Sequence, residues 1–309
     1  MENVTALNDH AAAARPTSAV KTFENRRQEI QRKERLTGLV TIGLLTILFL
    51  WSFGVSEFFD GNRGADPLAR MGRFLQLMNP NLRGEVLFED SSTSGSLASW
   101  FYAMPLWLPA LWQTLAIAIF SSVIGALIAI PVSMLASRNL VKQQMVCMVV
   151  RRILEAIRTL PDIIVALILV AAFGIGPLAG VITLSLSTIG RLGKLYSEVN
   201  ENADMKVLES IRGCGGGWWQ QIRYGLVPQA APGYASYALL KFEGNIGGAA
   251  ALGIVGAGGI GIELSRAITY TQFSDYLAIL LMITILIFIT DMVSEAIRHR
   301  LIGIQGGAI

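Results

Sequence analysis

The sequence predicts an all-α membrane protein with six transmembrane helices. Three observations carry this prediction: only 15% of the 309 residues are charged, 53% are hydrophobic, and the apolar residues gather in long runs. Soluble domains carry about 25% charged residues. A helix that crosses a bilayer needs about 20 mostly apolar residues, and the runs are of that length.

The predicted spans define the organisation of the chain. They lie at 36–55, 107–135, 155–175, 178–198, 229–252 and 276–296. Residues 1–35 are expected to form a polar tail, 56–106 a long loop, 107–298 a core of five spans with a loop at 199–228, and 299–309 a second tail. The first apolar run lacks a small-residue cleavage site, so we expect a retained anchor rather than a signal peptide.

Positive charge predicts the orientation. Most of the 25 Lys and Arg residues lie in the N-terminal tail and in the segments 136–158 and 190–227, which are therefore expected in the cytoplasm. The residues expected outside are Arg63, Arg70, Arg73, Arg83 and Arg266. Both termini should be cytoplasmic, and Cys147 and Cys214 should stay reduced thiols on that side of the membrane.

The long external loop contains a short amphipathic segment. Leu68, Met71, Leu75 and Met78 form one stripe of Pro67 to Met78, which predicts a helix on the membrane surface, with contact to an external partner as the alternative. Aromatic residues between Trp100 and Trp112 indicate an interfacial belt.

The predicted cytoplasmic loop 199–228 has a distinctive spacing. Glu209 is followed by Gly215 and then by Pro228, which predicts a short helix to about Ile211, a glycine-rich break and a second helix. This spacing resembles the EAA loop of ABC importer permeases, which forms a coupling helix that docks on an ATPase subunit. The resemblance implies that role for the positions Glu209, Ser210, Ile211, Arg212, Gly215 and Pro228.

The loop also departs from the EAA pattern. Ser210 and Ile211 replace two alanines, and Gly225 and Val227 replace Ile and Leu. The alternative interpretation is an ordinary cytoplasmic loop with a glycine at a helix end.

A glycine-rich stretch follows the fifth span. Gly256, Gly258 and Gly261 match the dinucleotide pattern GxGxxG, but that motif requires a preceding strand, whereas an apolar helix is expected here. Together with Gly259 these glycines indicate close helix packing and irregular backbone, which suits an external gate. The sequence has no GxxxxGK[ST] loop, so ATP hydrolysis is expected from a separate subunit.

Two ionisable residues, Lys241 and Glu243, lie inside the fifth span. Ionisable groups at membrane depth are candidates for a transport pathway. Lys241 is expected either to attract an anionic substrate or to form a structural ion pair with another span.

The segment around these residues resembles the phosphonate-transport permeases. Lys241-Phe242-Glu243-Gly244-Asn245 and the run Val255 to Gly261 carry the resemblance, with further similarity at Val150 to Arg158, Gly174 to Pro177 and Gly190 to Glu198. It implies the type I ABC importer permease fold and a pathway role for Asn245. Gly247 stands where relatives commonly have Arg, so phosphite or another small phosphorus oxyanion is the alternative substrate.

The resemblance further implies a transport subunit of the bacterial inner membrane rather than an enzyme. Its expected partners are a second copy of the chain, two cytoplasmic ABC ATPases, a periplasmic substrate-binding protein and the bilayer, with no nucleic acid. The chain is expected to bind no cofactor, because ATP and Mg would sit on the ATPases. The rivals are a secondary transporter, which would need an ion path of intramembrane carboxylates, and a nucleotide-dependent oxidoreductase, which would show cofactor absorbance.

Overall fold

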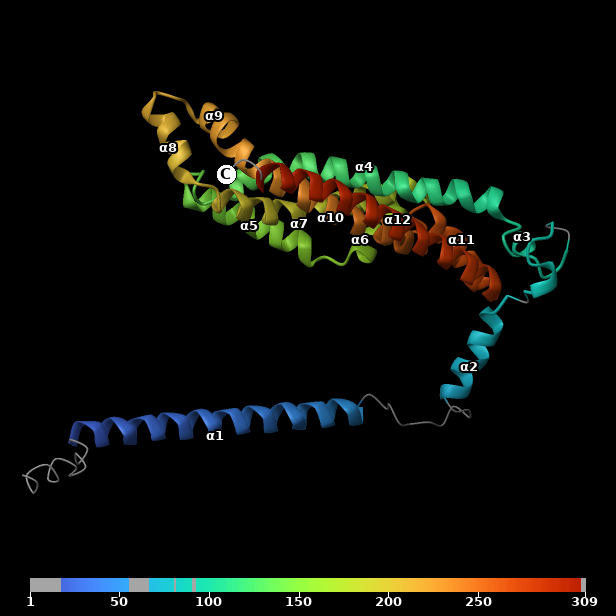
Figure 1. Cartoon of the computed structure of the whole chain (residues 1–309), viewed down its shortest axis with the longest axis horizontal. Coiled ribbons are helices and arrows are strands. Elements are labelled where there is room, and N and C mark those ends of the chain that lie inside the picture. Colours follow the sequence, from blue (N-terminus) through green and yellow to red (C-terminus); the bar gives the residue numbers. More distant parts are fainter. Residues whose placement is uncertain (1–17, 56–66, 81, 91–92, 307–309) are drawn as a thin grey trace, which may run out of the picture. The chain divides into compact units, whose positions relative to one another are not determined.

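The computed structural model describes residues 18–55, 67–80, 82–90 and 93–306, and this part of the chain is almost entirely helical (Figure 1). No strand occurs among these residues. The chain divides into two compact units, residues 1–71 and 72–309. Residues 1–17, the loop segment 56–66 with Arg63, and 307–309 lie outside the described part.

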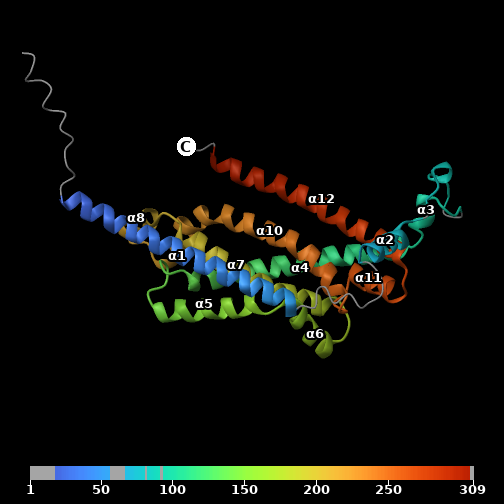
Figure 2. The same cartoon turned by 90° about the horizontal axis from the view of Figure 1, so that it is seen from below.

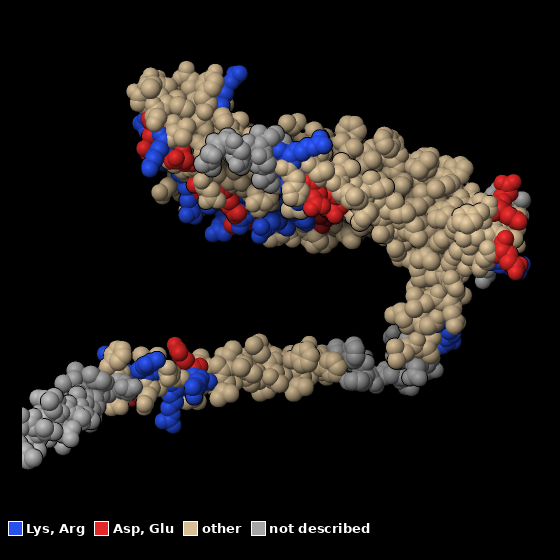
Figure 3. All heavy atoms as spheres, viewed as in Figure 1, with Lys and Arg blue, Asp and Glu red and all other residues tan. Residues whose placement is uncertain are grey.

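Helix α1, Ser18–Val55, makes up most of the described first unit. Charged side chains occupy its first half and uncharged ones its second half (Figure 3). In the apolar half, the hydroxyls of Thr37, Thr41 and Thr46 each donate to the carbonyl four residues earlier. Such bonds remove unpaired polar groups, which are costly in lipid. From Ser18 onward the predicted tail 1–35 is therefore part of the same helix as the first span.

The second unit is a helical bundle (Figures 1 and 2). Its long helices run between an end that carries α8 and α9 and an end that carries α3, which we call the α8 end and the α3 end. Helix α2, Pro67–Met78, has the predicted bounds and lies across the division between the units. The further elements are η2 (Gly84–Val86), α3 (Leu97–Trp100), α4 (Met104–Ala136), α5 (Gln144–Thr159), α6 (Asp162–Phe173), α7 (Pro177–Glu201), α8 (Met205–Gly213), α9 (Trp218–Gln220), the π-helix η3 (Gln221–Leu226), α10 (Val227–Gly253), α11 (Ile260–Thr269) and α12 (Phe273–Gly306).

Helices α4 and α7 share the most extensive contact in the bundle. Small residues make this approach possible, because they let helix backbones come close together. A Cβ atom at Gly125 of α4 would lie 2.5 Å from Cβ of Thr188 on α7, so a larger residue does not fit there.

Apolar clusters fill the bundle at three levels. At the α3 end, Trp107, Ile260 and Ile279 are buried together; Ile117, Leu184 and Leu252 lie in the middle; and Leu192, Tyr196 and Leu226 lie towards the α8 end. The burial of large side chains at each level stabilises the bundle along its whole length.

Helices occupy all six predicted span ranges, but they differ in how apolar they are. Among the described residues, Asn25–Val55, Met104–Ala136 and Phe273–Arg300 are each long and apolar enough to cross a membrane, and the pair α5 and α6 passes only as one span bent by 83°. Helices α7 and α10 are long enough, at roughly 37 and 40 Å. They carry many small and polar residues, which are buried inside the bundle.

The third predicted span, 155–175, is broken rather than continuous. Helix α5 ends at Thr159 and α6 begins at Asp162, with extended backbone at Leu160 and Pro161. Proline disfavours helical backbone in the residue before it, so Pro161 accounts for the break. The residues 299–306, predicted as part of a C-terminal tail, continue α12 instead.

Candidate functional site

Helix α8 lies within the predicted loop 199–228 and projects with α9 from one end of the bundle (Figure 1). Its start is fixed by the Asp204 side chain, which accepts a hydrogen bond from the backbone N–H of Lys206 at 2.9 Å. This is an ordinary N-cap. Leu208 is buried against Ile222 and Leu226, so one face of α8 is anchored to the chain that returns to α10.

The end of α8 requires glycine. Gly215 has φ of +85°, in the left-handed region where residues with a Cβ atom are strained. The backbone N–H of Gly216 donates to the Ile211 carbonyl, and a Cβ atom at Gly216 would lie 2.7 Å from that oxygen. The predicted break at these glycines is thus present, and it turns the chain sharply back towards the bundle.

Two of the departures from the EAA pattern compensate for each other. A Cβ atom at Gly225 would lie 3.2 Å from Cδ1 of Ile211 and 3.2 Å from Cδ1 of Leu208. The large side chain at 211 therefore occupies the space that the glycine at 225 leaves free. Compared with the EAA pattern, position 211 has a larger residue, Ile in place of Ala, and position 225 has a smaller one, Gly in place of Ile.

Gln229 ties α8 to α10, a role that no motif in the sequence indicates. Its Oε1 accepts from the backbone N–H of Asp204 at 2.8 Å, and its Nε2 donates to the Gly225 carbonyl at 2.8 Å. One side chain at the start of α10 thus holds both ends of the projecting segment, at Asp204 before α8 and at Gly225 in η3. Pro228, beside it, is exposed in the first turn of α10, where the missing N–H of proline costs nothing.

A buried polar network lies where the projecting segment of α8 and α9 leaves the bundle. Asn200 of α7 is fully buried, and its Nδ2 donates to Ser137 Oγ at 3.1 Å. The Tyr234 hydroxyl of α10 donates to Asn200 Oδ1, and the Tyr196 hydroxyl donates to the Tyr234 carbonyl at 3.0 Å. These bonds connect the ends of α4, α7 and α10 at the point where α8 departs from the bundle. Buried networks of this kind hold helices in a fixed arrangement.

The outer face of α8 is open. Glu209, Ser210 and Arg212 are exposed, and Ile211 is half-buried. Glu209 and Arg212 form no ion pair with another described residue, and the Ser210 hydroxyl donates only to the Lys206 carbonyl of its own helix. The predicted coupling positions thus divide into an exposed set and the structural residues Ile211 and Gly215.

The two ionisable residues of α10 point to different neighbours. Glu243 accepts a 2.9 Å bond from Arg298 Nη2 of α12, so it belongs to a structural ion pair. Lys241 forms no ion pair with a described residue, and the charges that act on it most strongly are those of Arg191 and Asp162. The sequence left two roles open for Lys241, attraction of an anionic substrate or a structural ion pair. Among the described residues, Glu243 forms such an ion pair and Lys241 does not.

Asn245 lies inside the bundle rather than at an opening. It is fully buried, and its Nδ2 donates to Ser122 Oγ at 2.8 Å and to Thr188 Oγ1 at 3.0 Å. It therefore ties α10 to α4 and α7. At Gly247, by contrast, a Cβ atom would meet no other atom within 4 Å, so this position has room for a side chain to begin.

The glycine-rich turn between α10 and α11 is packed at the α3 end. Gly256, Gly258 and Gly259 all have φ between +75° and +92°. The Gly259 N–H donates to Gln113 Oε1 at 2.9 Å, and the Ile260 N–H donates to Thr114 Oγ1 at 2.8 Å, so α4 caps the start of α11. Helix α10, not a strand, precedes these glycines, which contradicts a dinucleotide site.

The glycines of this turn also allow contacts that no other residue permits. A Cβ atom at Gly261 would lie 2.0 Å from the Ala250 carbonyl oxygen, and one at Gly258 would lie 2.9 Å from Cα of Pro177. The Gly176 N–H donates to the Gly256 carbonyl at 3.0 Å. The turn after α10 and the turn before α7 thus interlock, and a shift of one moves the other.

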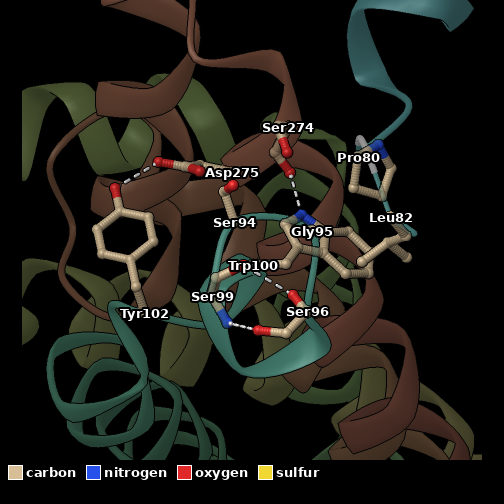
Figure 4. Close-up of a pocket in the computed structure, with 10 residues that line it drawn as sticks. All are labelled: Pro80, Leu82, Ser94, Gly95, Ser96, Ser99, Trp100, Tyr102, Ser274 and Asp275. Atoms are coloured by element: carbon tan, nitrogen blue, oxygen red, sulfur yellow. Dashed lines mark hydrogen bonds between the residues drawn. The ribbon is translucent and has the colours of Figure 1, made fainter. Parts of the chain in front are cut away.

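A polar cavity of about 390 Å³ lies beside α3 (Figure 4). Trp100 Nε1 donates to the Ser274 carbonyl at 3.0 Å, and the Tyr102 hydroxyl donates to Asp275 Oδ2 at 2.8 Å. The Asp275 bond, together with burial, raises the pKa of Tyr102 above its ordinary value. These bonds fasten the segment before α4 to the start of α12.

Comparison with known proteins decides the family. The family model described as "Binding-protein-dependent transport system inner membrane component" matches residues 129–303, which cover more than half of the chain from the end of α4 into α12. The chain belongs to this family. The permease is therefore a multi-pass inner-membrane transport protein, and the matched range contains α8, the glycine-rich turn and the charged residues of α10.

Curated relatives of the permease are bacterial. It is 35% identical over 190 residues to the phosphate-import permease protein PhnE of Mycolicibacterium smegmatis, covering 62% of this chain and 36% of that one. It is 34% identical to the phosphite transport system permease protein PtxC of Stutzerimonas stutzeri, covering 63% and 70%. It is 37% identical to the putative cryptic phosphonate transport system permease protein PhnE2 of Escherichia coli, covering 39% and 99%.

The fold of the permease matches a solved ABC importer. The methionine transporter MetNI, in an inward-facing conformation, has a chain that superimposes with a TM-score of 0.57 at 23% identity, covering 65% of this chain and 98% of that one. This likeness, with the all-helical structure, confirms the predicted type I importer permease fold. The predicted membership of the phosphonate permease family is also confirmed.

Proposed function

We propose that this permease is the membrane-spanning subunit of an ATP-driven importer of phosphonates. Two copies would form the pathway, two cytoplasmic ATPase subunits would bind ATP and Mg and supply the energy, and a periplasmic binding protein would deliver the substrate. The observation that carries this proposal is the exposed outer face of α8, on a projecting segment of a chain in the binding-protein-dependent family. This outer face, unlike the buried face around Leu208, is exposed and therefore suited to a partner.

In this proposal the α8 end is cytoplasmic, as are both termini, because Lys and Arg residues concentrate in the segments on that side. Glu209, Ser210 and Arg212 would contact the ATPase subunit. Leu208 and Gln229 would pass its movement to α10, since they join α8 to the start of that helix. Helix α10 would then move relative to α4 and α7, and this movement would change the side of the membrane to which the transport pathway is open.

The glycine-rich turn would act as the external gate. It is the place where α10, α4 and the turn before α7 interlock through backbone contacts that tolerate no side chain. A movement of α10 would release or re-form these contacts as one unit, because packed interfaces switch between discrete arrangements. Lys241 would lie on the pathway below this gate.

A phosphonate is the first candidate for the substrate, and phosphite is the second. The family resemblance and the E. coli relative favour phosphonate. The glycine at position 247, where relatives commonly have Arg, and the similarity to PtxC favour phosphite or another small phosphorus oxyanion. A binding assay of the cognate binding protein with methylphosphonate, 2-aminoethylphosphonate, phosphite and phosphate separates them.

The native cysteines provide a test of the docking surface. Cys214 is exposed at the end of α8, whereas Cys147 is buried with its thiol donating to the Ala136 carbonyl at 3.0 Å. A maleimide should label Cys214 in the purified permease, and saturating ATPase subunit should protect it. Cys147 serves as the silent internal control, and Cys214→Ser should abolish labelling. Equal labelling of Cys214 with and without ATPase would contradict docking at α8.

A further inference from the structure

Two charged residues meet where α6 and α7 come together, and a third, Lys241, lies on α10, which packs against both of these helices. Asp162 lies in the first turn of α6, and its Oδ2 is 3.5 Å from Arg191 Nη2 of α7 and accepts from Ser187 Oγ at 3.3 Å. Arg191 and Asp162 are also the charged groups that act most strongly on Lys241 of α10. Two cations and one carboxylate thus lie on these three packed helices, and together they carry a formal net charge of plus one.

The three charged residues lie at similar levels along their helices. Counting from the α3 end of each helix, Asp162, Arg191 and Lys241 lie roughly 16, 21 and 18 Å along α6, α7 and α10. The hydrocarbon core of a bilayer is about 30 Å thick, so each residue lies more than half of that thickness from the α3 end of its helix. Ionisable groups at that depth are costly and are characteristic of substrate and ion pathways.

The pair between Arg191 and Asp162 is loose. A tight bond between arginine and carboxylate is about 2.7 to 2.9 Å long, against 3.5 Å here. The Arg191 side chain is 47% exposed and that of Asp162 is 29% exposed, so the guanidinium retains N–H groups that another acceptor can reach. Lys241 makes no hydrogen bond with a described residue.

The ion pair on the other side of α10 shows the contrast. Glu243 and Arg298 meet at 2.9 Å, with side-chain exposures of 15% and 28%. That pair is close, as expected of a structural contact between α10 and α12, and a second carboxylate, Asp291, also acts on Glu243. The group around Lys241 has one cation too many for internal balance.

We infer that Lys241 and Arg191 form a transient oxyanion site in the pathway, and that Asp162 occupies it in place of the substrate. This inference rests on the proposed function. A phosphonate or phosphite group presents anionic oxygens like those of a carboxylate, and the planar guanidinium accepts such groups in a forked geometry. An arriving oxyanion displaces Asp162 from Arg191. When Asp162 returns to Arg191, the oxyanion is released. Binding is thereby kept weak enough for transport.

The test uses the charge balance of the group. In proteoliposomes with the ATPase, and with binding protein saturated with methylphosphonate, Lys241→Met should lower the uptake rate about tenfold, because a charged hydrogen-bond donor is lost. Asp162→Asn should also lower the rate, because the anion is then held too tightly. The double variant Asp162→Asn/Lys241→Met restores the net charge of plus one and should recover most of the loss caused by Lys241→Met.

The control is Arg152→Gln. This arginine is 77% exposed on α5 and pairs only with Glu155 one turn away, so its removal should leave uptake unchanged. Correct assembly of every variant is checked by co-elution with the ATPase subunit. A double variant as impaired as Lys241→Met, or a Lys241→Met variant with normal uptake, would overturn the inference. Wild-type protein without uptake of any phosphorus oxyanion would instead refute the proposed function, and the inference with it.

Discussion

The exchange of sizes between Ile211 and Gly225 predicts a specific double-mutant result. Gly225→Ile restores the residue of the EAA pattern, but its Cβ atom alone would lie 3.2 Å from Ile211 Cδ1 and from Leu208 Cδ1. The remaining carbons of the new side chain would extend into the same space. Ile211→Ala restores the other residue of the pattern and removes one of these obstacles.

The magnitude follows from the packing. Overpacking a buried site costs about 1 to 3 kcal/mol, so Gly225→Ile alone should destabilise the α8 segment by about 2 kcal/mol. Ile211 is half-buried, so Ile211→Ala alone should cost about 1 kcal/mol, less than a fully buried isoleucine. Residues in contact show coupling energies of about 0.5 to 3 kcal/mol, and here the double variant should recover at least about 1 kcal/mol.

Two measurements test the energetic coupling between positions 211 and 225. Thermal unfolding of the purified permease reports stability, at about 2 to 4 °C for each kcal/mol in a protein of this size. The ratio of substrate transported to ATP hydrolysed reports how well transport is coupled to ATP hydrolysis. This ratio should fall in Gly225→Ile and return towards the wild-type value in the double variant. Strictly additive effects of the two substitutions in both assays would refute the compensation between positions 211 and 225.

Three further predictions concern the bundle. Gly261→Ala places a Cβ atom 2.0 Å from the Ala250 carbonyl and should lower the unfolding temperature by at least about 4 °C, while Gly244→Ala, which meets no atom within 4 Å, should leave it unchanged or raise it slightly. Arg298→Gln leaves Glu243 unpaired and should destabilise by about 1 to 2 kcal/mol, measured by the same unfolding assay, with recovery in the neutral double variant Glu243→Gln/Arg298→Gln. Gly247→Arg should fold normally because the position is open, and it should change the relative uptake of methylphosphonate and phosphite; identical uptake ratios would argue against a role in selectivity.

Local patterns in the sequence predicted the local structure well. The helix at Pro67–Met78, the helix and glycine break around Glu209 to Gly217, and the end of α10 before the glycine-rich turn all follow from periodicity and from glycine and proline chemistry. These features depend on neighbouring residues, which the sequence displays directly.

Features that join distant residues were not predictable. Gln229 bonds to Asp204 and Gly225, Asn200 bonds to Tyr234, and Asp162 pairs with Arg191 only because the bundle brings them together. A polar residue in a helix gives no sign in the sequence of which partner it will meet. The sequence therefore identified Lys241 as a candidate but could not name the residues that complete its site.

The bend between α5 and α6 was missed for a related reason. Pro161 was visible, but an apolar run on both sides of a proline is compatible with a kinked span as well as with two separate helices. The choice between them depends on the surrounding helices, because α5 and α6 both pack on α7.

Uptake in a purified system tests the central claim most directly. Proteoliposomes that contain the permease and its ATPase are given binding protein loaded with radiolabelled methylphosphonate or phosphite, with ATP and Mg or without them. Accumulation of one of these oxyanions that requires ATP, the ATPase and the binding protein is the result we predict. Uptake that proceeds equally without ATP or without the ATPase would contradict the assignment as an ATP-driven importer subunit.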